Sequence, residues 1–420
     1  MVPPLSDHLS QLGTETAYAV AGEAKALAAT GKTVYPFHIG DMNFVTPPCV
    51  VNACKNAIDE GKTGYCAAAG VQPLREAIAK HVTATRKPTT PYGAENVSVQ
   101  PGGKPVIQKF LASVLQFKDN NEEEVMYPNP GYPIYESQAR FLGATLKPYG
   151  FKEVDGDYRL DMDHFRSLIG PRTRAVILNN YHNPTGTVYS KEEVEEIASL
   201  CVKHNVWVLA DEAYWDILYD IQPTSVASLE GMWERTVLLF TYSKSWGMTG
   251  WRLGAAVGPQ PIIDAISKLT TNQEACTCHF VQYAGISCLE HPQAKEFIRD
   301  MNAELKKRRH TLTAALREVP EVKFTVPAAT FYCWVDVTEV MQRFGFGDDV
   351  ERFRQQVLKD SGVCFCTRAH FGEKLPGETK QYVRFAFSGI SCEDIERGVG
   401  AFKQWIQNYN SSEAEALPNF

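Results

Sequence analysis

The strongest constraint on the fold is a series of short apolar runs between residues 95 and 260. Each run is apolar throughout and ends in polar or Gly/Pro-rich residues before a helical stretch begins. The runs are EEVMYP (123–128), RAVILNN (174–180), VWVLADE (206–212), TVLLFTYS (236–243) and RLGAAVG (252–258). Strands with this composition are typically covered by helices on both faces. The pattern predicts an α/β sheet of mostly parallel strands, with ligands at the carboxyl ends of the strands.

The chain has 420 residues, too many for one ordinary core, so two packed units are expected. A large domain is predicted over residues 46–295, and a smaller α+β domain with a long charged helix over residues 296–410. Residues 1–45 should form an arm that completes the small domain, with an Ala-rich helix between Thr14 and Thr30. The polar residues 411–420 are predicted to be a flexible tail.

Composition argues against several classes of partner. The formal charge is −7 and no Lys/Arg-rich run occurs, so neither nucleic acid nor an anionic membrane is expected. No apolar stretch approaches the roughly 18–20 residues of a membrane span, and the first residues lack the layout of a secretory signal, which predicts a cytoplasmic protein. None of the eleven cysteines forms a Cys-x-x-Cys pair, so we expect free, mostly buried thiols and no metal site.

Lys244 follows one of the apolar runs, in TYSKSWGMTGWRLG. A lysine in this position is ordinarily a solvated turn residue. Here Trp246, Met248 and Trp251 are close in sequence, and Arg252 lies eight positions on. Apolar surroundings and a neighbouring cation lower the pKa of an amine. An amine with a lowered pKa is suited to forming a Schiff base.

Two other runs end in polar residues that could face the same edge of the sheet. Asp211 closes VLAD, and a buried carboxylate needs a partner. That partner is either a structural cation or the protonated pyridine nitrogen of a pyridoxal-phosphate ring. The segment NYHNPTG is either an ordinary turn or places the Asn183 amide against the phenolic oxygen of that ring, which Tyr214 could also reach. We interpret Tyr181 and His182 as packing residues.

The segment QPGGKP (100–105) opens a predicted helix. Glycines before a proline are common at helix starts, and they also leave backbone N–H groups free to bind phosphate. The segment is not a P-loop, and the chain has no G-x-G-x-x-G dinucleotide fingerprint.

In this order and combination the segments resemble the class I and II aminotransferases of pyridoxal 5′-phosphate (PLP) fold type I. The resemblance extends from about Tyr35 to Phe402, and Ser-Lys…Gly-Trp-Arg is its most specific part. It implies a mostly parallel seven-stranded sheet sandwiched by helices, a smaller α+β domain, PLP as cofactor and a homodimer. The Ala-rich helix would lie over the site as a lid.

The resemblance also implies a role for each matching residue of the cofactor site. Lys244 would carry PLP as an internal aldimine and move the proton at the substrate α-carbon. Asp211 would pair with the pyridine nitrogen, and Asn183 and Tyr214 would contact the phenolic oxygen. Tyr132 would stack on the ring face. The catalytic set would be Lys244, Asp211 and Tyr214.

The phosphate would be held by the backbone N–H groups of Gly103 and Lys104, by Ser243 and Arg252, and by Tyr65 of the neighbouring subunit. For the substrate, the resemblance implies that Arg384 binds the α-carboxylate, a group that suits the forked guanidinium. Gly40 and Asn183 would line the same subsite.

The substrate remains open. The chain reads Gly-Asp-Met-Asn-Phe at 40–44 where the family has Gly-x-Pro-x-Phe, and residues 179–184 and 270–284 also depart from the common pattern. Aromatic residues that could form walls of the substrate subsite, or could equally be core, are Tyr18, Tyr35, Phe37, Trp246 and Phe371.

We expect an aminotransferase that moves the amino group of an L-amino acid to a 2-oxo acid by a ping-pong mechanism. The alternative is another PLP enzyme on the same fold, namely an amino-acid oxidase, lyase or decarboxylase, because the pocket decides the fate of the carbanion. A non-enzymatic PLP sensor of transcription would need an appended DNA-binding domain and a basic face. The acidic chain, with only about 35 residues before the matching region, argues against it.

Overall fold

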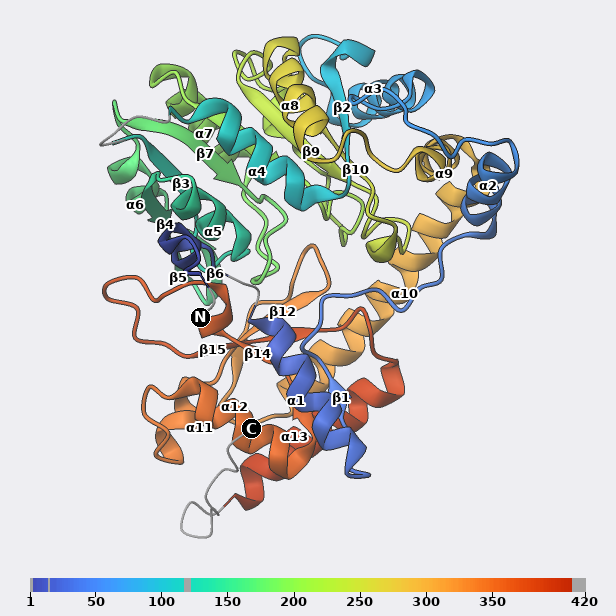
Figure 1. Ribbon diagram of the computed structural model, residues 1–420. Helices are drawn as coiled ribbons and strands as arrows, with labels where there is room; N and C mark the ends of the chain where they lie inside the picture. Colours follow the sequence, from blue (N-terminus) through green and yellow to red (C-terminus); the bar gives the residue numbers. More distant parts are fainter. Residues whose placement is uncertain (1–2, 14–15, 117–121, 410–420) are drawn as a thin grey trace.

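A seven-stranded sheet forms the centre of the larger unit in the computed structural model, which describes residues 3–13, 16–116 and 122–409 (Figure 1). In spatial order its strands are β2 (Val97–Gln100), β10 (Gly254–Val257), β9 (Thr236–Thr241), β8 (Trp207–Asp211), β7 (Thr173–Leu178), β3 (Glu124–Pro128) and β4 (Thr145–Tyr149). Strands β9, β8, β7, β3 and β4 are mutually parallel, whereas β10 is antiparallel to both of its neighbours. The predicted mostly parallel sheet is confirmed.

Helices cover both faces of this sheet. One layer contains α4 (Gly103–Val114), α5 (Ile134–Phe141) and α8 (Gln260–Gln273), and the other contains α2 (Pro48–Asp59), α3 (Gln72–Arg86), α6 (Met162–Leu168), α7 (Lys191–Lys203) and α9 (His279–Glu290). Successive strand residues point to opposite layers, so Val208 and Ala210 belong to one apolar core and Leu209 to the other. Because both faces are buried, the strand sequences are apolar throughout.

The smaller unit contains an antiparallel sheet in the order β11 (Lys323–Phe324), β12 (Tyr332–Asp336), β15 (Tyr382–Ala386) and β14 (Cys366–Thr367). Its helices are α11 (Thr338–Arg343), α12 (Val350–Ser361) and α13 (Cys392–Asn408), together with most of α10 (Pro292–Arg317). Helix α10 places Ala294 in the core of the larger unit and Met301 in the core of the smaller unit. The domain limit expected at residues 295 and 296 therefore falls inside one helix, and it stays a prediction.

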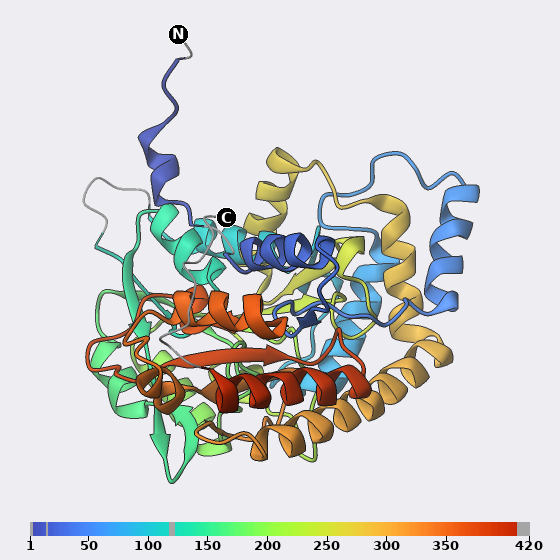
Figure 2. The same cartoon turned by 90° about the horizontal axis from the view of Figure 1, so that it is seen from below.

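The first part of the chain packs on the smaller unit. Strand β1 (Tyr35–Pro36) pairs in parallel with β13 (Val363–Cys364). Helix α1 (Ala17–Ala29) buries Val20 and Ala24 against α12 and β13. The 3₁₀ helix η1 (Asp7–Gln11) instead lies beside α5 of the larger unit, and Figure 2 shows the chain before it projecting from the body of the molecule.

A two-stranded hairpin of β5 (Phe151–Val154) and β6 (Asp157–Leu160) completes the strands. Among the described helices, none combines the length and the apolar character needed to cross a membrane. All eleven cysteines lie in the described ranges as free thiols, and Cys278 alone of these is exposed. The predicted tail, 411–420, lies outside the described residues.

Candidate active site

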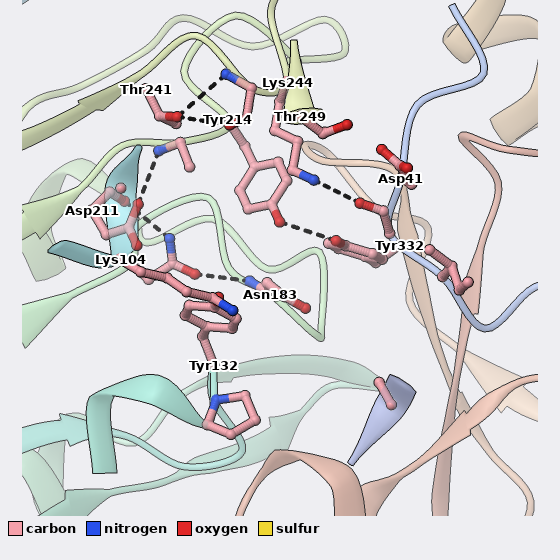
Figure 3. Close-up of a pocket in the computed structure, with 18 of the residues that line it drawn as sticks. Asp41, Lys104, Tyr132, Asn183, Asp211, Tyr214, Thr241, Lys244, Thr249 and Tyr332 are labelled. Atoms are coloured by element: carbon pink, nitrogen blue, oxygen red, sulfur yellow. Dashed lines mark hydrogen bonds between the residues drawn. The ribbon is translucent and has the colours of Figure 1, made fainter. Parts of the chain in front are cut away.

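A cavity of ≈ 570 Å³ lies where the carboxyl ends of β7, β8 and β9 face the smaller unit (Figure 3). Its lining includes all but one of the residues to which the family resemblance assigns a role toward the cofactor or the α-carboxylate: Gly40, Gly103, Lys104, Tyr132, Asn183, Asp211, Tyr214, Ser243, Lys244, Arg252 and Arg384. The exception is Tyr65, whose side chain is 88% exposed between α2 and α3, outside this cavity. The fold thus brings most of the predicted site together from distant parts of the chain.

Lys244 lies three residues after the end of β9 and points across the cavity. Its Nζ donates a hydrogen bond to the backbone oxygen of Gly40 at 2.6 Å and lies 5.7 Å from the centroid of the Phe331 ring. Trp246 and Met248, expected to surround the lysine, pack instead into the core of the larger unit. The aromatic ring near the amine therefore comes from a segment that is distant in sequence, so sequence proximity could not identify it.

Asp211 is the last residue of β8, and its carboxylate is buried. Its Oδ2 accepts a hydrogen bond from the Tyr135 hydroxyl at 2.7 Å, and its Oδ1 accepts one from the Ala213 backbone N–H at 3.1 Å. Burial still raises the pKa of this carboxyl to about 6. The sequence reasoning missed Tyr135, although it follows Tyr132 by three residues, a spacing that puts both on one side of a helical turn.

Tyr214 contacts the smaller unit through Tyr332, a residue that the sequence analysis also missed. Its hydroxyl lies 3.0 Å from that of Tyr332, as Figure 3 shows. Burial, and then the neighbouring Tyr332, hold the pKa of Tyr214 well above its usual range, so the hydroxyl keeps its proton. A Cβ atom placed on Gly40 would lie 2.1 Å from the Tyr332 hydroxyl oxygen, which explains the need for glycine there.

Arg384 projects from β15 into the cavity and is 4% exposed. Its Nη1 donates to Asn183 Oδ1 at 2.9 Å and its Nη2 to the His38 backbone oxygen at 2.8 Å. The guanidinium carbon lies 4.2 Å from the Tyr332 ring centroid and 4.7 Å from that of Phe371. No described residue accepts a hydrogen bond from Arg384 Nε. Since Asn183 Oδ1 is the acceptor, the NH₂ group of that amide is left as a donor.

Another part of the cavity, formed by the start of α4 and by Arg252, has the features of an anion-binding site; we call it the anion cradle. Helix α4 begins at Gly103, so its first backbone N–H groups point toward the cavity, an arrangement that favours phosphate. Gly102 has a φ of +97°, and a Cβ atom there would lie 2.1 Å from Arg252 Nη2. Thr241, which the sequence analysis did not predict, also lines this cavity, and its Oγ1 accepts a hydrogen bond from the Ser243 backbone N–H at 3.3 Å.

These features fit PLP. The amine of Lys244, the anion cradle and a buried carboxylate at Asp211 match the aldehyde, the phosphate and the cationic ring nitrogen of that cofactor. The cavity volume also lies within the range usual for small-molecule sites.

The expected aromatic walls are present only in part. Tyr18 and Phe371 line the cavity, whereas Tyr35, Phe37 and Trp246 do not. His182 is fully buried and stacks 4.4 Å from the Phe151 ring, and burial lowers its pKa to about 3. This neutral histidine is a packing residue in the structure.

Comparisons with a family model, with related sequences and with solved structures agree with one another. The family model described as aminotransferase class I and II matches residues 32–402. A probable aspartate/prephenate aminotransferase of Aquifex aeolicus is 29% identical, over 96% of this chain and 98% of its own. An aromatic-amino-acid aminotransferase 2 of Thermococcus litoralis is 31% identical, over 88% and 90%. The solved aspartate aminotransferase from Thermus thermophilus with maleate aligns with a TM-score of 0.86 at 26% identity, over 96% and 100% of the two chains.

Proposed function

The chain belongs to the class I and II aminotransferases, and we propose that it moves the amino group of an L-amino acid to a 2-oxo acid with PLP bound covalently to Lys244. The observation that carries this proposal is a single cavity lined by Lys244, Asp211 and Arg384. These three residues supply an amine, a buried anion and a carboxylate-binding cation. The cycle would be ping-pong, because one cavity must accept the amino acid and the oxo acid in turn.

When bound, PLP supplies an electron sink for the bond that is broken at the substrate α-carbon. Its phosphate would be held by the backbone N–H groups of Gly103 and Lys104 and by the side chains of Ser243 and Arg252. These groups lie at the start of α4, just after β9 and just before β10, so every phosphate contact made by the same subunit would come from its larger unit.

The ring would be held by residues that control its protonation. Asp211 would keep the pyridine nitrogen protonated, and this ion pair would offset the cost of burying the carboxylate. Asn183 and Tyr214 would donate hydrogen bonds to the phenolic oxygen, and the raised pKa of Tyr214 keeps its proton in place. Tyr132, two residues before the start of α5, would cover one ring face.

Arg384 would bind the α-carboxylate of both substrates. Its guanidinium is buried and aligned by Asn183 and the His38 backbone. With the carboxylate fixed there, the amine of Lys244 would take the proton from the α-carbon as a general base. The preferred side chain is left to experiment, and the names of the relatives suggest testing acidic and aromatic amino acids first.

We also propose a homodimer in which Tyr65 reaches the phosphate of the partner subunit. In support, this large side chain is 88% exposed and sits in the segment between α2 and α3, away from the cavity of its own chain. A tyrosine this exposed makes few contacts within its own subunit.

The test uses the PLP-loaded protein and its absorbance spectrum. Single L-amino acids are added without oxo acid and without oxygen. A stoichiometric change in the cofactor spectrum that 2-oxoglutarate or pyruvate reverses would support transamination and would rank the donors. Oxygen consumption or carbon dioxide release, with no reversal by an oxo acid, would favour the oxidase or decarboxylase alternative. Lys244→Ala should lose the spectrum of covalently bound cofactor.

A further inference from the structure

A buried arginine that the proposed chemistry does not use lies behind the wall of the cavity. Arg368 is 1% exposed and starts the 3₁₀ helix η5 (Arg368–Phe371) of the smaller unit. Its Nε and Nη2 donate to the Glu378 carboxylate at 2.6 and 3.0 Å, and its Nη1 donates to the Gly372 oxygen at 2.6 Å. Its Nη2 also donates to Asn129 Oδ1 at 2.7 Å and to the Glu373 oxygen at 3.1 Å.

Asn129 belongs to the larger unit, directly after β3, so its bond to Arg368 joins the two units. Two further hydrogen bonds run beside it. Asn129 Nδ2 donates to the Glu373 oxygen at 2.7 Å, and the Gly131 backbone N–H donates to the Phe371 oxygen at 2.9 Å. We call these five residues (Asn129, Gly131, Arg368, Phe371 and Glu373) the clamp.

The clamp connects the segments that carry Tyr132 and Phe371, both of which line the cavity. Tyr132, which would cover the cofactor ring, follows Gly131 directly, and Phe371 lies 4.7 Å from the guanidinium carbon of Arg384. The distance between the ring site and the carboxylate site therefore depends on how the two units are held together at this point. A buried guanidinium with acceptors in both units is a rigid connector, because leaving any of its donors unpaired is costly.

We propose that Arg368 is a positioning residue: through Asn129 it aligns the Tyr132 side of the cavity with the Phe371 and Arg384 side. This inference rests on the proposed function, because it assigns the cofactor mainly to the larger unit and the α-carboxylate to Arg384 of the smaller unit. It follows that breaking the clamp should weaken the binding of substrates, which contact both units, much more than the binding of PLP.

The kinetic test compares Arg368→Leu and Asn129→Ala with the wild-type protein. We expect the KM for both the amino acid and the oxo acid to rise about tenfold, with kcat and the Kd for PLP changing less than about threefold. Arg368→Lys keeps the positive charge, but its single ammonium group cannot donate hydrogen bonds to Glu378 and Asn129 with the geometry of a planar guanidinium. Its KM should be intermediate.

Phe353→Leu is the matched control, since Phe353 is fully buried in the core of the smaller unit and is not part of the clamp. It should lower the urea midpoint without raising the KM. If Phe353→Leu raises the KM as much as Arg368→Leu does, the effect is general destabilisation and the inference is wrong.

A second measurement, amide hydrogen exchange, does not depend on enzyme activity. In the cofactor-free protein, Arg368→Leu should speed amide hydrogen exchange in residues 129–133, and Phe353→Leu should not. A wild-type protein that fails to transaminate would overturn the proposed function, yet the exchange result would still test the clamp. A wild-type protein that does transaminate, with unchanged KM and unchanged exchange in Arg368→Leu, would overturn the clamp alone.

Discussion

Among single residues, Asp211 shows most clearly how burial controls chemistry. Its carboxylate has two hydrogen-bond donors, Tyr135 and the Ala213 backbone, yet burial raises its pKa to about 6. A raised pKa means that the folded protein holds the proton more tightly than the unfolded chain does. The stability linked to this residue is therefore fully present below the pKa of an unfolded aspartate, about 4, and is lost as the pH rises through about 6.

Asp211→Asn should accordingly stabilise the cofactor-free protein at neutral pH, because it removes a buried charge. Relative to wild type, the free energy of unfolding of the variant should increase by up to about 3 kcal/mol between pH 4 and pH 7 and stay constant above that. Urea unfolding of both proteins across this range measures the difference. The same variant should bind PLP more weakly, since the ring nitrogen loses its anion. A stability difference independent of pH would show that Asp211 is not buried as the structure has it.

Several residues of the site could be predicted because they follow apolar strands in the chain. Asp211 and Lys244 were found in this way, and the family resemblance added Arg384. Tyr332 could not be found, because its role depends on the register of β12 and β15, which pairs it with Ala386 and so places it diagonally to Arg384. Trp246 was misplaced because residues two apart in a turn need not face the same side.

At the level of elements, the apolar strands were readable but their directions were not. A run such as GAAV is equally apolar in either orientation, so the antiparallel setting of β10 could not be anticipated. The boundary between the two units could not be predicted from the sequence either, because α10 is a single uninterrupted helix whose one apolar stripe contributes to both cores.

Helix α1 illustrates how an element from one unit shapes the cavity. It is held by Val20, which is 1% exposed, and by an ion pair of 2.9 Å between Glu23 and Arg354, while Ala17 and Tyr18 at its start line the cavity. Because the start of α1 lines the cavity, we expect that its contact with α12 and β13 affects substrate binding as well as stability.

Val20→Asp should detach α1, because an unpaired buried carboxylate costs about 3 kcal/mol or more in this contact. We expect faster trypsin cleavage after the exposed Lys25 and a higher KM for the amino acid, with PLP still bound. Ala28→Asp, on the exposed side of the same helix, is the control and should change neither. Equal cleavage and equal KM in both variants would contradict the role of α1 as a cover.

At the scale of the whole molecule, the proposed dimer makes a prediction about mixed subunits. Homodimers of either variant should be nearly inactive. Tyr65→Ala damages the phosphate site of the partner subunit, and Lys244→Ala removes the amine from the site of its own subunit. In a random mixture, half of the dimers are hybrids, and each hybrid has one intact site. Co-refolding the two variants should thus restore about a quarter of the wild-type activity. No recovery, with dimers present by ultracentrifugation, would show that Tyr65 serves its own subunit or none.

The pairing of β1 with β13 has a consequence for how the protein is made. Tyr35 lies beside Val363. The β1 segment is synthesised early, and it cannot pair with β13 until roughly 330 more residues have been translated. At roughly 5–20 residues per second, the wait is on the order of 15 to 65 seconds. During that time the apolar residues of α1 and β1 have no native surface to cover them. The nascent arm is thus accessible to chaperones, and to premature association between neighbouring nascent chains, for most of translation.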